Sequence, residues 1–116
     1  MNLLEETKDI LEEHGLTMDD IEWVGNYDYT FPIEKFIELA DIEYNDGYGT
    51  AQVASDLLIC GKDWWLERGE YDGSEWWEYK VAPTKPTMEL DVEKLVSRWG
   101  GYLEVMQYED EGDYLT

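Results

Sequence analysis

The sequence contains few of the residues on which catalytic and metal-binding sites depend. Its 116 residues include one cysteine, Cys60, and one histidine, His14. One cysteine forms no disulfide within the chain, and zinc sites need several Cys or His ligands. His14 falls on the apolar stripe of a predicted helix and Cys60 in the apolar run 57–60, so both are expected to pack rather than react. The sequence therefore predicts a protein that is not an enzyme, with no catalytic residue, metal site or cofactor.

Basic residues are scarce as well. Eight Lys and Arg stand against 29 Asp and Glu, which gives a formal net charge of −21. Binding to nucleic acid or to an anionic membrane requires positive charge, so neither is expected as a direct partner. The favoured partner is a basic protein surface, of the kind found in nucleic-acid-binding proteins. Alternatively, the acidic residues serve only to keep the protein in solution.

Long apolar runs are also missing. No run approaches the roughly 18 residues of a membrane-spanning helix. The first 15 residues are interrupted by acids and lack the basic and apolar regions of a signal peptide. We therefore expect a protein of the cytoplasm of the host cell. The length predicts a single domain over residues 1–116, and the acidic residues 109–116 are expected to fray.

Aromatic residues, by contrast, are abundant. The chain has six Trp and nine Tyr, and each large ring buries about 150–250 Å² when it packs. These rings must supply much of the apolar area of the core or of a contact surface. We expect four of the six tryptophans in the core.

The segment 57–81 gives the clearest prediction of structure. Gly61-Lys62 and Asp72-Gly73 are typical two-residue hairpin turns. They predict three antiparallel strands at 57–60, 63–71 and 74–81. The second turn places Leu66 opposite Tyr79 and Arg68 opposite Trp77, and the first places Ile59 opposite Trp64. Both turns direct the same apolar side of the sheet inward.

The other face of this meander is predicted to carry two tryptophans and a pair of carboxylates. Trp65 and Trp76 alternate there with Glu67 and Glu78, and Trp76 lies opposite Gly69, as in aromatic rescue of a strand glycine. Directly opposed carboxylates can resemble the acid pair of a glycosidase. A solvated charged face, or one awaiting a basic partner, is the favoured interpretation.

Helices are predicted on both sides of this meander in the sequence. Asn2 can cap a first helix that Gly15 ends, and Pro32 can begin a second that extends to Tyr44. A third is expected over 91–99. A short strand or hairpin is expected near 21–31. The fold class is therefore α+β, with two to three helices packed on a small antiparallel meander.

The predicted core combines the apolar stripes of these helices with the inner face of the meander. It comprises Leu4, Ile10, Leu11, Ile33, Phe36, Ile37, Ile59, Trp64, Leu66, Trp77, Tyr79 and Val81.

A contact surface of acids and exposed aromatics is the strongest functional candidate. Carboxylates three or four residues apart on a helix lie about 5–6 Å from one another, and such rows can approximate a phosphate backbone. Exposed tryptophans can stand in for stacked bases or act as binding hot spots. The predicted partner-binding residues are Trp65, Glu67, Glu70, Asp72, Glu75, Trp76 and Glu78.

Residues 61–86, GKDWWLERGEYDGSEWWEYKVAPTKP, resemble a segment of small acidic proteins of phages and prophages of Gram-positive bacteria. Those proteins also tend to open with an acidic helix and a short DDI-x-WVG segment, which residues 19–25 match here. The similarity covers much of residues 1–86. No function is established for that family, so the resemblance implies only an accessory protein of a mobile element.

Three functions fit these observations. The first is a DNA-mimic inhibitor of a nucleic-acid-binding host defence protein, either anti-CRISPR or anti-restriction; it rests on an analogy of charge and size with other small phage proteins. The second is a general protein-interaction or assembly module anchored by Trp65 and Trp76. The third is a small hydrolase that uses Glu67 and Glu78. The sequence leaves the partner and the oligomeric state open.

Overall fold

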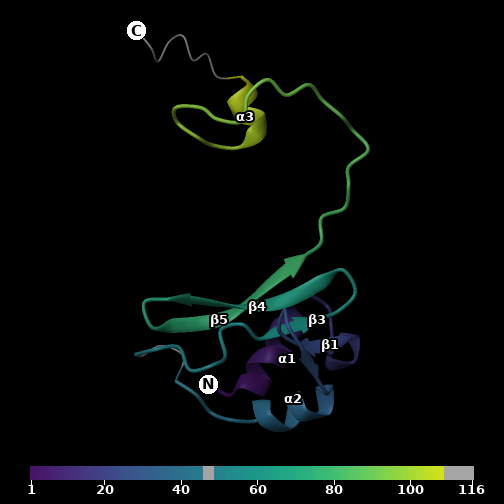
Figure 1. Ribbon diagram of the computed structural model, residues 1–116, viewed down its shortest axis with the longest axis vertical. Helices are drawn as coiled ribbons and strands as arrows, with labels where there is room; N and C mark the ends of the chain where they lie inside the picture. The colour runs from purple at the N-terminus through teal and green to yellow at the C-terminus, as the bar shows by residue number, and fades with distance from the viewer. Residues whose placement is uncertain (46–48, 109–116) are drawn as a thin grey trace. The chain divides into compact units, whose positions relative to one another are not determined.

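The computed structural model describes residues 1–45 and 49–108, which divide into two compact units. The first unit spans Met1–Pro83 and the second begins at Thr84 (Figure 1). The sequence predicted one domain over residues 1–116, whereas the structure separates the chain after Pro83. The predicted frayed segment, 109–116, lies outside the described residues.

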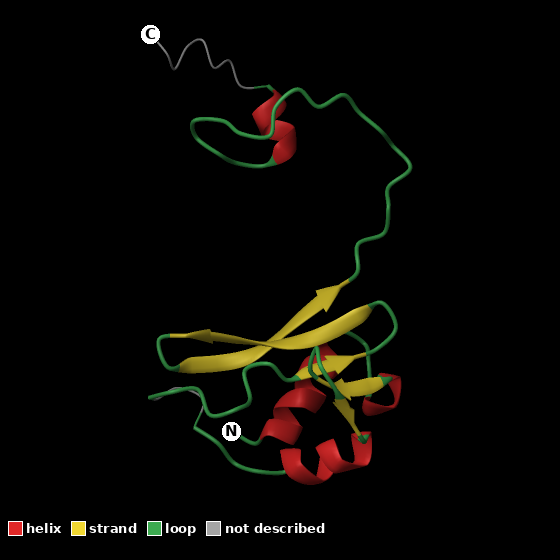
Figure 2. Ribbon diagram, viewed as in Figure 1, coloured by secondary structure: helices red, strands yellow, loops and turns green. Residues whose placement is uncertain are grey.

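The first unit is built on a five-stranded antiparallel sheet with the strand order β2-β1-β3-β4-β5. Its strands are β1 (Trp23–Gly25), β2 (Thr30–Phe31), β3 (Leu58–Cys60), β4 (Trp64–Tyr71) and β5 (Ser74–Val81). Two helices, α1 (Leu3–Glu13) and α2 (Ile33–Ala40), lie on one side of the sheet (Figure 2). The predicted α+β class, with helices on an antiparallel meander and a hairpin near 21–31, is confirmed.

The β4–β5 hairpin has the predicted register. Tyr71 pairs with Ser74, and Leu66 pairs with Tyr79. The turn consists of Asp72 and Gly73, with φ of 51° and 86°. Both residues adopt the left-handed conformation that matches the twist of the two strands.

The β3–β4 register differs from the predicted one by two residues. Ile59 pairs with Leu66 rather than with Trp64. The turn residues are Lys62 and Asp63, because the backbone N–H of Gly61 donates to the Trp64 carbonyl at 3.0 Å. The indole of Trp64 covers Gly61 so closely that a Cβ there would lie 2.1 Å from the ring. A shift of two residues leaves every side chain on its predicted face, since the period of a strand is two.

The two long helices begin where the sequence predicted. The Asn2 side chain accepts the N–H of Glu5 at the start of α1, and Pro32 precedes α2. α2 ends at Ala40 rather than continuing to Tyr44. The reason is pairing with the N-terminus: the Leu3 N–H donates to the Ile42 carbonyl, and the Tyr44 N–H donates to the Met1 carbonyl.

The third helix lies at α3 (Leu103–Gln107), not at 91–99 as predicted. Residues 91–99 are irregular. The Gln107 side chain accepts the N–H groups of Glu93 and Lys94 and donates to the Lys94 carbonyl. These hydrogen bonds hold residues 93–94 in a non-helical path against α3.

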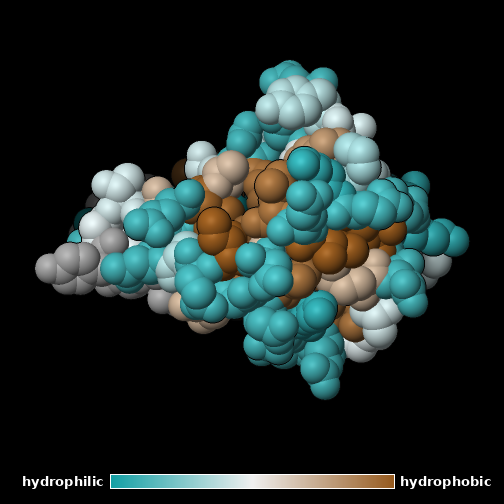
Figure 3. All heavy atoms as spheres, turned by 90° about the horizontal axis from the view of Figure 1, so that it is seen from below, coloured by the Kyte–Doolittle hydropathy of each residue, from teal (hydrophilic) through white to brown (hydrophobic). Residues whose placement is uncertain are grey.

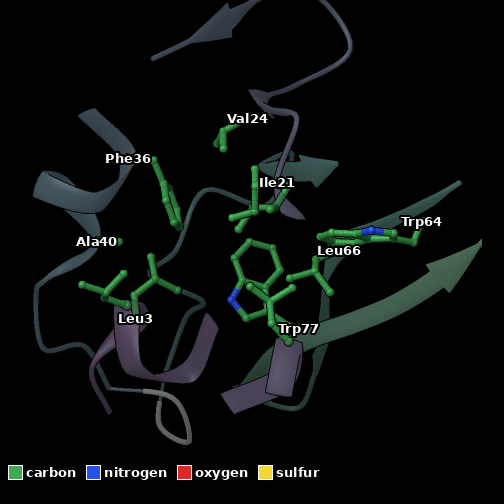
Figure 4. Packing of buried hydrophobic residues seen from close by; sticks show 11 residues of the cluster. Leu3, Ile21, Val24, Phe36, Ala40, Trp64, Leu66 and Trp77 are labelled. Atoms are coloured by element: carbon green, nitrogen blue, oxygen red, sulfur yellow. The ribbon is translucent and has the colours of Figure 1, made fainter. Parts of the chain in front are cut away.

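The core of the first unit lies between the two helices and the inner face of the sheet. Figure 4 shows side chains from α1 and α2 meeting Leu66 and Trp77 of the sheet. Of the predicted core, the buried members are Leu4, Leu11, Phe36, Ile59, Trp64, Leu66 and Trp77, and the partly buried ones are Ile10, Ile33 and Tyr79.

Two residues of the predicted core, and the predicted number of buried tryptophans, are wrong. Ile37 is 39% exposed at the margin of the buried stripe of α2, and Val81 is exposed at the end of the edge strand β5. Trp64 and Trp77 are buried, so two of the six tryptophans lie in the core rather than four. The other four tryptophans, Trp23, Trp65, Trp76 and Trp99, are partly or largely exposed.

Candidate functional site

Three tryptophans lie on the outer face of the sheet, opposite the helices. Trp23, Cys60 and Trp65 are direct cross-strand neighbours on β1, β3 and β4, and Lys80 of β5 continues the same row. The third tryptophan, Trp76, is 38% exposed and belongs to the same face. This outer face contains the predicted contact residues Trp65, Glu67, Trp76 and Glu78.

A hollow of about 560 Å³ opens at one end of this face. Trp23 and Trp65 stand on strands that flank β3, so the small side chain of Cys60 lies between two indoles. Burial raises the pKa of the Cys60 thiol, which keeps the thiol protonated at neutral pH. The lining residues are Trp23, Asn26, Tyr27, Leu58, Cys60, Gly61, Asp63, Trp64, Trp65 and Ala82.

The predicted carboxylate pair on this face is bridged by a lysine. Glu67 pairs with Glu78 across β4 and β5. The Lys80 ammonium lies 3.9 Å from a Glu67 carboxylate oxygen and 3.4 Å from one of Glu78. All three side chains are more than one third exposed. The arrangement is that of a solvated ion-pair group.

Trp76 packs over Gly69 as aromatic rescue predicts. A Cβ at Gly69 would lie 2.6 Å from the Trp76 indole nitrogen and 2.3 Å from a Glu78 carboxylate oxygen. Because Gly69 has no side chain, the side chains of Trp76 and Glu78 can pack directly on its backbone. This contact fixes Trp76 on the outer face, where it stays 38% exposed.

Glu75 is misplaced in the predicted contact surface. It lies on the inner face of β5 and is 4% exposed. Its carboxylate pairs with Arg68 at 3.0 Å and accepts the backbone N–H groups of Gln52 and Val53. Glu75 therefore anchors the segment after α2 to the sheet and is not available to a partner.

Arg68 forms the centre of this buried polar cluster. Its side chain is 3% exposed, lies 3.4 Å from Glu6 and stacks 4.7 Å from the Trp77 ring centroid. Burial alone would lower the pKa of Arg68, but the Tyr44 hydrogen bond and the Glu6 and Glu75 carboxylates raise it above its usual value. Sequence reasoning placed Arg68 on the apolar face opposite Trp77 but did not identify its partners, which come from distant segments.

The remaining predicted contact residues lie at the exposed tip of the hairpin. Glu70 and Asp72 are both exposed, and Asp72 is one of the two turn residues. They are separate from the outer-face group around Trp65.

A second acidic surface runs along α1 and continues to the 3₁₀ turn η1 (Met18–Asp20). Its six exposed acids, which we call the α1 acidic ridge, are Glu5, Asp9, Glu12, Glu13, Asp19 and Asp20. Neighbouring acids on successive helical turns lie about 5–6 Å apart. Residues 1–83 contain 21 Asp and Glu against five Lys and Arg, so this ridge belongs to a strongly negative unit.

An apolar groove of about 410 Å³ lies beside α2. Figure 3 shows apolar side chains gathered across this side of the molecule, with hydrophilic groups around them. Leu39 and Ile42 are 57% and 58% exposed here. Leu3, Phe36 and Val53 also line the groove, so it is continuous with the core.

The second unit exposes most of its large apolar side chains. Of its residues up to 108, Met106 is the one buried hydrophobic. The exposed ones are Met88, Leu90, Val92, Leu95, Val96, Trp99, Tyr102, Leu103, Val105 and Tyr108. This unit therefore buries little of its own apolar surface.

His14, which was predicted to pack rather than react, is exposed. Its ring stacks on Tyr79 with centroids 3.7 Å apart. Within residues 1–45 and 49–108, no three His, Cys, Asp or Glu side chains gather closely enough to hold a metal ion. No helix in the same ranges has the length and apolar character needed to cross a membrane.

Comparisons of the chain with protein families, with curated proteins and with solved structures gave no match.

Proposed function

We propose that the protein is an acidic inhibitor that occupies the basic groove of a nucleic-acid-binding protein in place of DNA. The observation that carries the proposal is the α1 acidic ridge, with its six exposed carboxylates on α1 and η1. In the same unit Arg68 is buried between two acids, and Lys80 and Lys35 are each paired with carboxylates. Three of the five cations of residues 1–83 are thus paired with acids outside the ridge, whereas Lys8 lies on α1 beside the ridge acids.

The physical basis of such binding is electrostatic. A groove lined by Lys and Arg holds its DNA through phosphate contacts and releases counterions when DNA binds. A row of carboxylates about 5–6 Å apart offers the same groove negative charge at comparable intervals. Long-range attraction accelerates the encounter at low salt and weakens as salt rises.

The resemblance of residues 61–86 to small phage proteins supports a target in host defence. An RNA-guided nuclease or a restriction enzyme of a Gram-positive host has the required basic groove. On this proposal the protein acts in the cytoplasm of the host cell.

The test measures DNA binding by a panel of purified RNA-guided nucleases and restriction enzymes with and without the protein, at about 50 mM and 200 mM salt. We expect one target to lose DNA binding at low salt and to recover it at the higher salt. The triple variant Glu5→Lys, Asp9→Lys, Glu12→Lys should abolish inhibition. The matched control reverses three exposed acids outside the ridge, Glu22, Glu34 and Glu38. Inhibition that is indifferent to salt, or that survives the ridge variant, would overturn the proposal.

A second candidate function is a protein-interaction module that uses the outer face of the sheet. It is favoured by Trp76, a large indole that stays 38% exposed on the same face as Trp65. This function requires that Trp65→Ala or Trp76→Ala weakens association with the target more than the ridge variant does. The same binding assay therefore separates the two functions.

A further inference from the structure

We propose that the hollow on the outer face of the sheet binds a trimethylammonium group. Its two main walls are the indoles of Trp23 and Trp65, and its floor includes Cys60. Adjacent strands lie about 4.8 Å apart, so residues on β1 and β4 are separated by about 10 Å across β3. This backbone spacing leaves room above Cys60 for a small cation flanked by both side chains, and cation–π attraction extends to roughly 6 Å from a ring centroid.

The other lining residues extend this apolar, aromatic surface. Tyr27 stands at the rim, where it is 82% exposed, and the Trp64 ring covers Gly61 at one end. Leu58 lies beside Cys60 in the floor. Aromatic rings gathered around one opening are the usual means by which proteins recognise quaternary ammonium groups.

One carboxylate stands at this opening. Of the lining residues that the structure describes, Asp63 alone carries a charge. It occupies the β3–β4 turn with φ of 66°, and its carbonyl accepts the Ala82 N–H at 2.8 Å. The turn is thereby tied to the end of β5, which fixes the backbone of Asp63 beside the hollow.

The polar chemistry of the hollow favours a methylated cation over an ordinary one. The Asn26 carbonyl oxygen already accepts the N–H groups of Asp28 and Tyr29, and its amide donates to Asp56. A primary ammonium or a guanidinium would bring three or five N–H donors into a site with few free acceptors. A trimethylammonium group has no N–H to satisfy, so its burial loses no hydrogen bond.

Two kinds of molecule present this group: choline derivatives and trimethylated lysine. Phosphocholine adds a phosphate, which the net charge of −21 and Asp63 repel. A trimethyl-lysine in a basic segment adds cations, which the protein attracts. The charge therefore favours trimethyl-lysine. This choice of carrier rests on the proposed function, whereas the trimethylammonium site itself does not.

The site is tested by titrating the full chain with choline and following the six indole N–H signals by NMR. We expect millimolar affinity and shifts confined to the lining indoles of Trp23, Trp64 and Trp65, with Trp76 and Trp99 unmoved. The neutral isostere 3,3-dimethylbutan-1-ol should bind at least about tenfold more weakly, because it lacks the charge that the rings attract. Equal binding of the isostere, or shifts spread over all six indoles, would overturn the site.

Matched variants locate the binding. Trp65→Leu should weaken choline binding at least about tenfold, while Trp76→Leu, on the same face but outside the hollow, should leave it unchanged. Asp63→Asn should weaken it severalfold, and Asp72→Asn should not. Asp63 and Asp72 are both exposed turn residues with positive φ, and asparagine tolerates that conformation. The Asp63→Asn and Asp72→Asn pair keeps the test valid if Trp65→Leu fails to fold. Unchanged choline binding in both Asp63→Asn and Trp65→Leu would refute the assignment.

The carrier is tested with an arginine-flanked peptide that contains trimethyl-lysine, the same peptide with unmodified lysine, and phosphocholine. At least tenfold tighter binding of the methylated peptide supports the proposal, and equal binding of both peptides overturns it. Tighter binding of phosphocholine would overturn the basic carrier while retaining the trimethylammonium site. The α1 ridge variant should bind choline normally, so loss of the proposed inhibition and loss of this site are distinguishable.

Discussion

The indole N–H of Trp77 donates a 2.9 Å hydrogen bond to the hydroxyl of Thr7, which in turn donates to the Leu3 carbonyl at 2.8 Å. Thr7 is fully buried, and 70 positions separate it from Trp77 in the sequence. This chain of two hydrogen bonds joins β5 to the first turn of α1. It allows a tryptophan to fill the core without leaving its one polar atom unpaired.

Replacing Thr7 by valine tests this relationship. Valine has the same shape but no hydroxyl, so the Trp77 indole N–H would stay buried without an acceptor. We expect a loss of about 1–3 kcal/mol in the free energy of unfolding, measured by urea denaturation. Thr7→Ser keeps the hydroxyl and should retain more of the stability than valine does. A valine variant as stable as the wild type would contradict a structural role for this hydrogen bond.

Removing the charge of Glu75 tests the buried Arg68 cluster. Glu75→Gln leaves Arg68 with Glu6 as its remaining carboxylate partner and weakens the anchor of Gln52 and Val53. The expected loss is about 3 kcal/mol, because a buried charge that loses a partner is left partly uncompensated. Glu70→Gln is the matched control: Glu70 pairs with Glu75 across the strands but is exposed. The two variants should therefore differ clearly in their urea midpoints.

Ionisation of Tyr44 is expected to lower the stability of the fold at alkaline pH. Burial, followed by the hydrogen bond to Glu6, raises the pKa of Tyr44 from 10.0 to about 12. The folded state thus favours the neutral phenol, so this contribution to stability is fully present below pH 10 and is lost as the pH rises towards 12. Spectroscopic titration near 295 nm should show one tyrosine ionising later than the exposed ones. Tyr44→Phe should lose less stability than the wild type between pH 10 and 12, and parallel losses would argue against this assignment.

The separation of the chain after Pro83 predicts that residues 1–83 fold alone. All members of the core cluster lie in this range, from Leu3 to Trp77. A chain that ends at Pro83 should keep its near-ultraviolet circular dichroism and unfold in urea within about 1 kcal/mol of the full chain. A larger loss would show that residues 84–116 contribute to the stability of the first unit.

Local sequence patterns were sufficient to predict much of this fold. The turn Asp72-Gly73 defined the longest hairpin, because both positions need a left-handed backbone and few other residue pairs supply it. Asn2 and Pro32 marked the starts of two helices, since caps act on their immediate neighbours. The alternation of side chains put Trp65 and Trp76 on one face of the sheet, and the structure confirms it.

Contacts between distant segments decided what the sequence patterns could not. The predicted contact surface included Glu75, but its burial depends on Arg68 and on the backbone of residues 52–53. α2 ends at Ala40 because the next residues pair with the N-terminus, an interaction that no helical pattern records.

The sequence by itself determined the charge of this protein, its α+β elements and the two faces of its main hairpin, because these depend on composition and on near neighbours. Only the tertiary structure decided which acids are exposed and which enclose Arg68, and that Trp23 and Trp65 stand on either side of Cys60. Strand order and burial arise from pairings across tens of residues, and a local pattern contains no information about them.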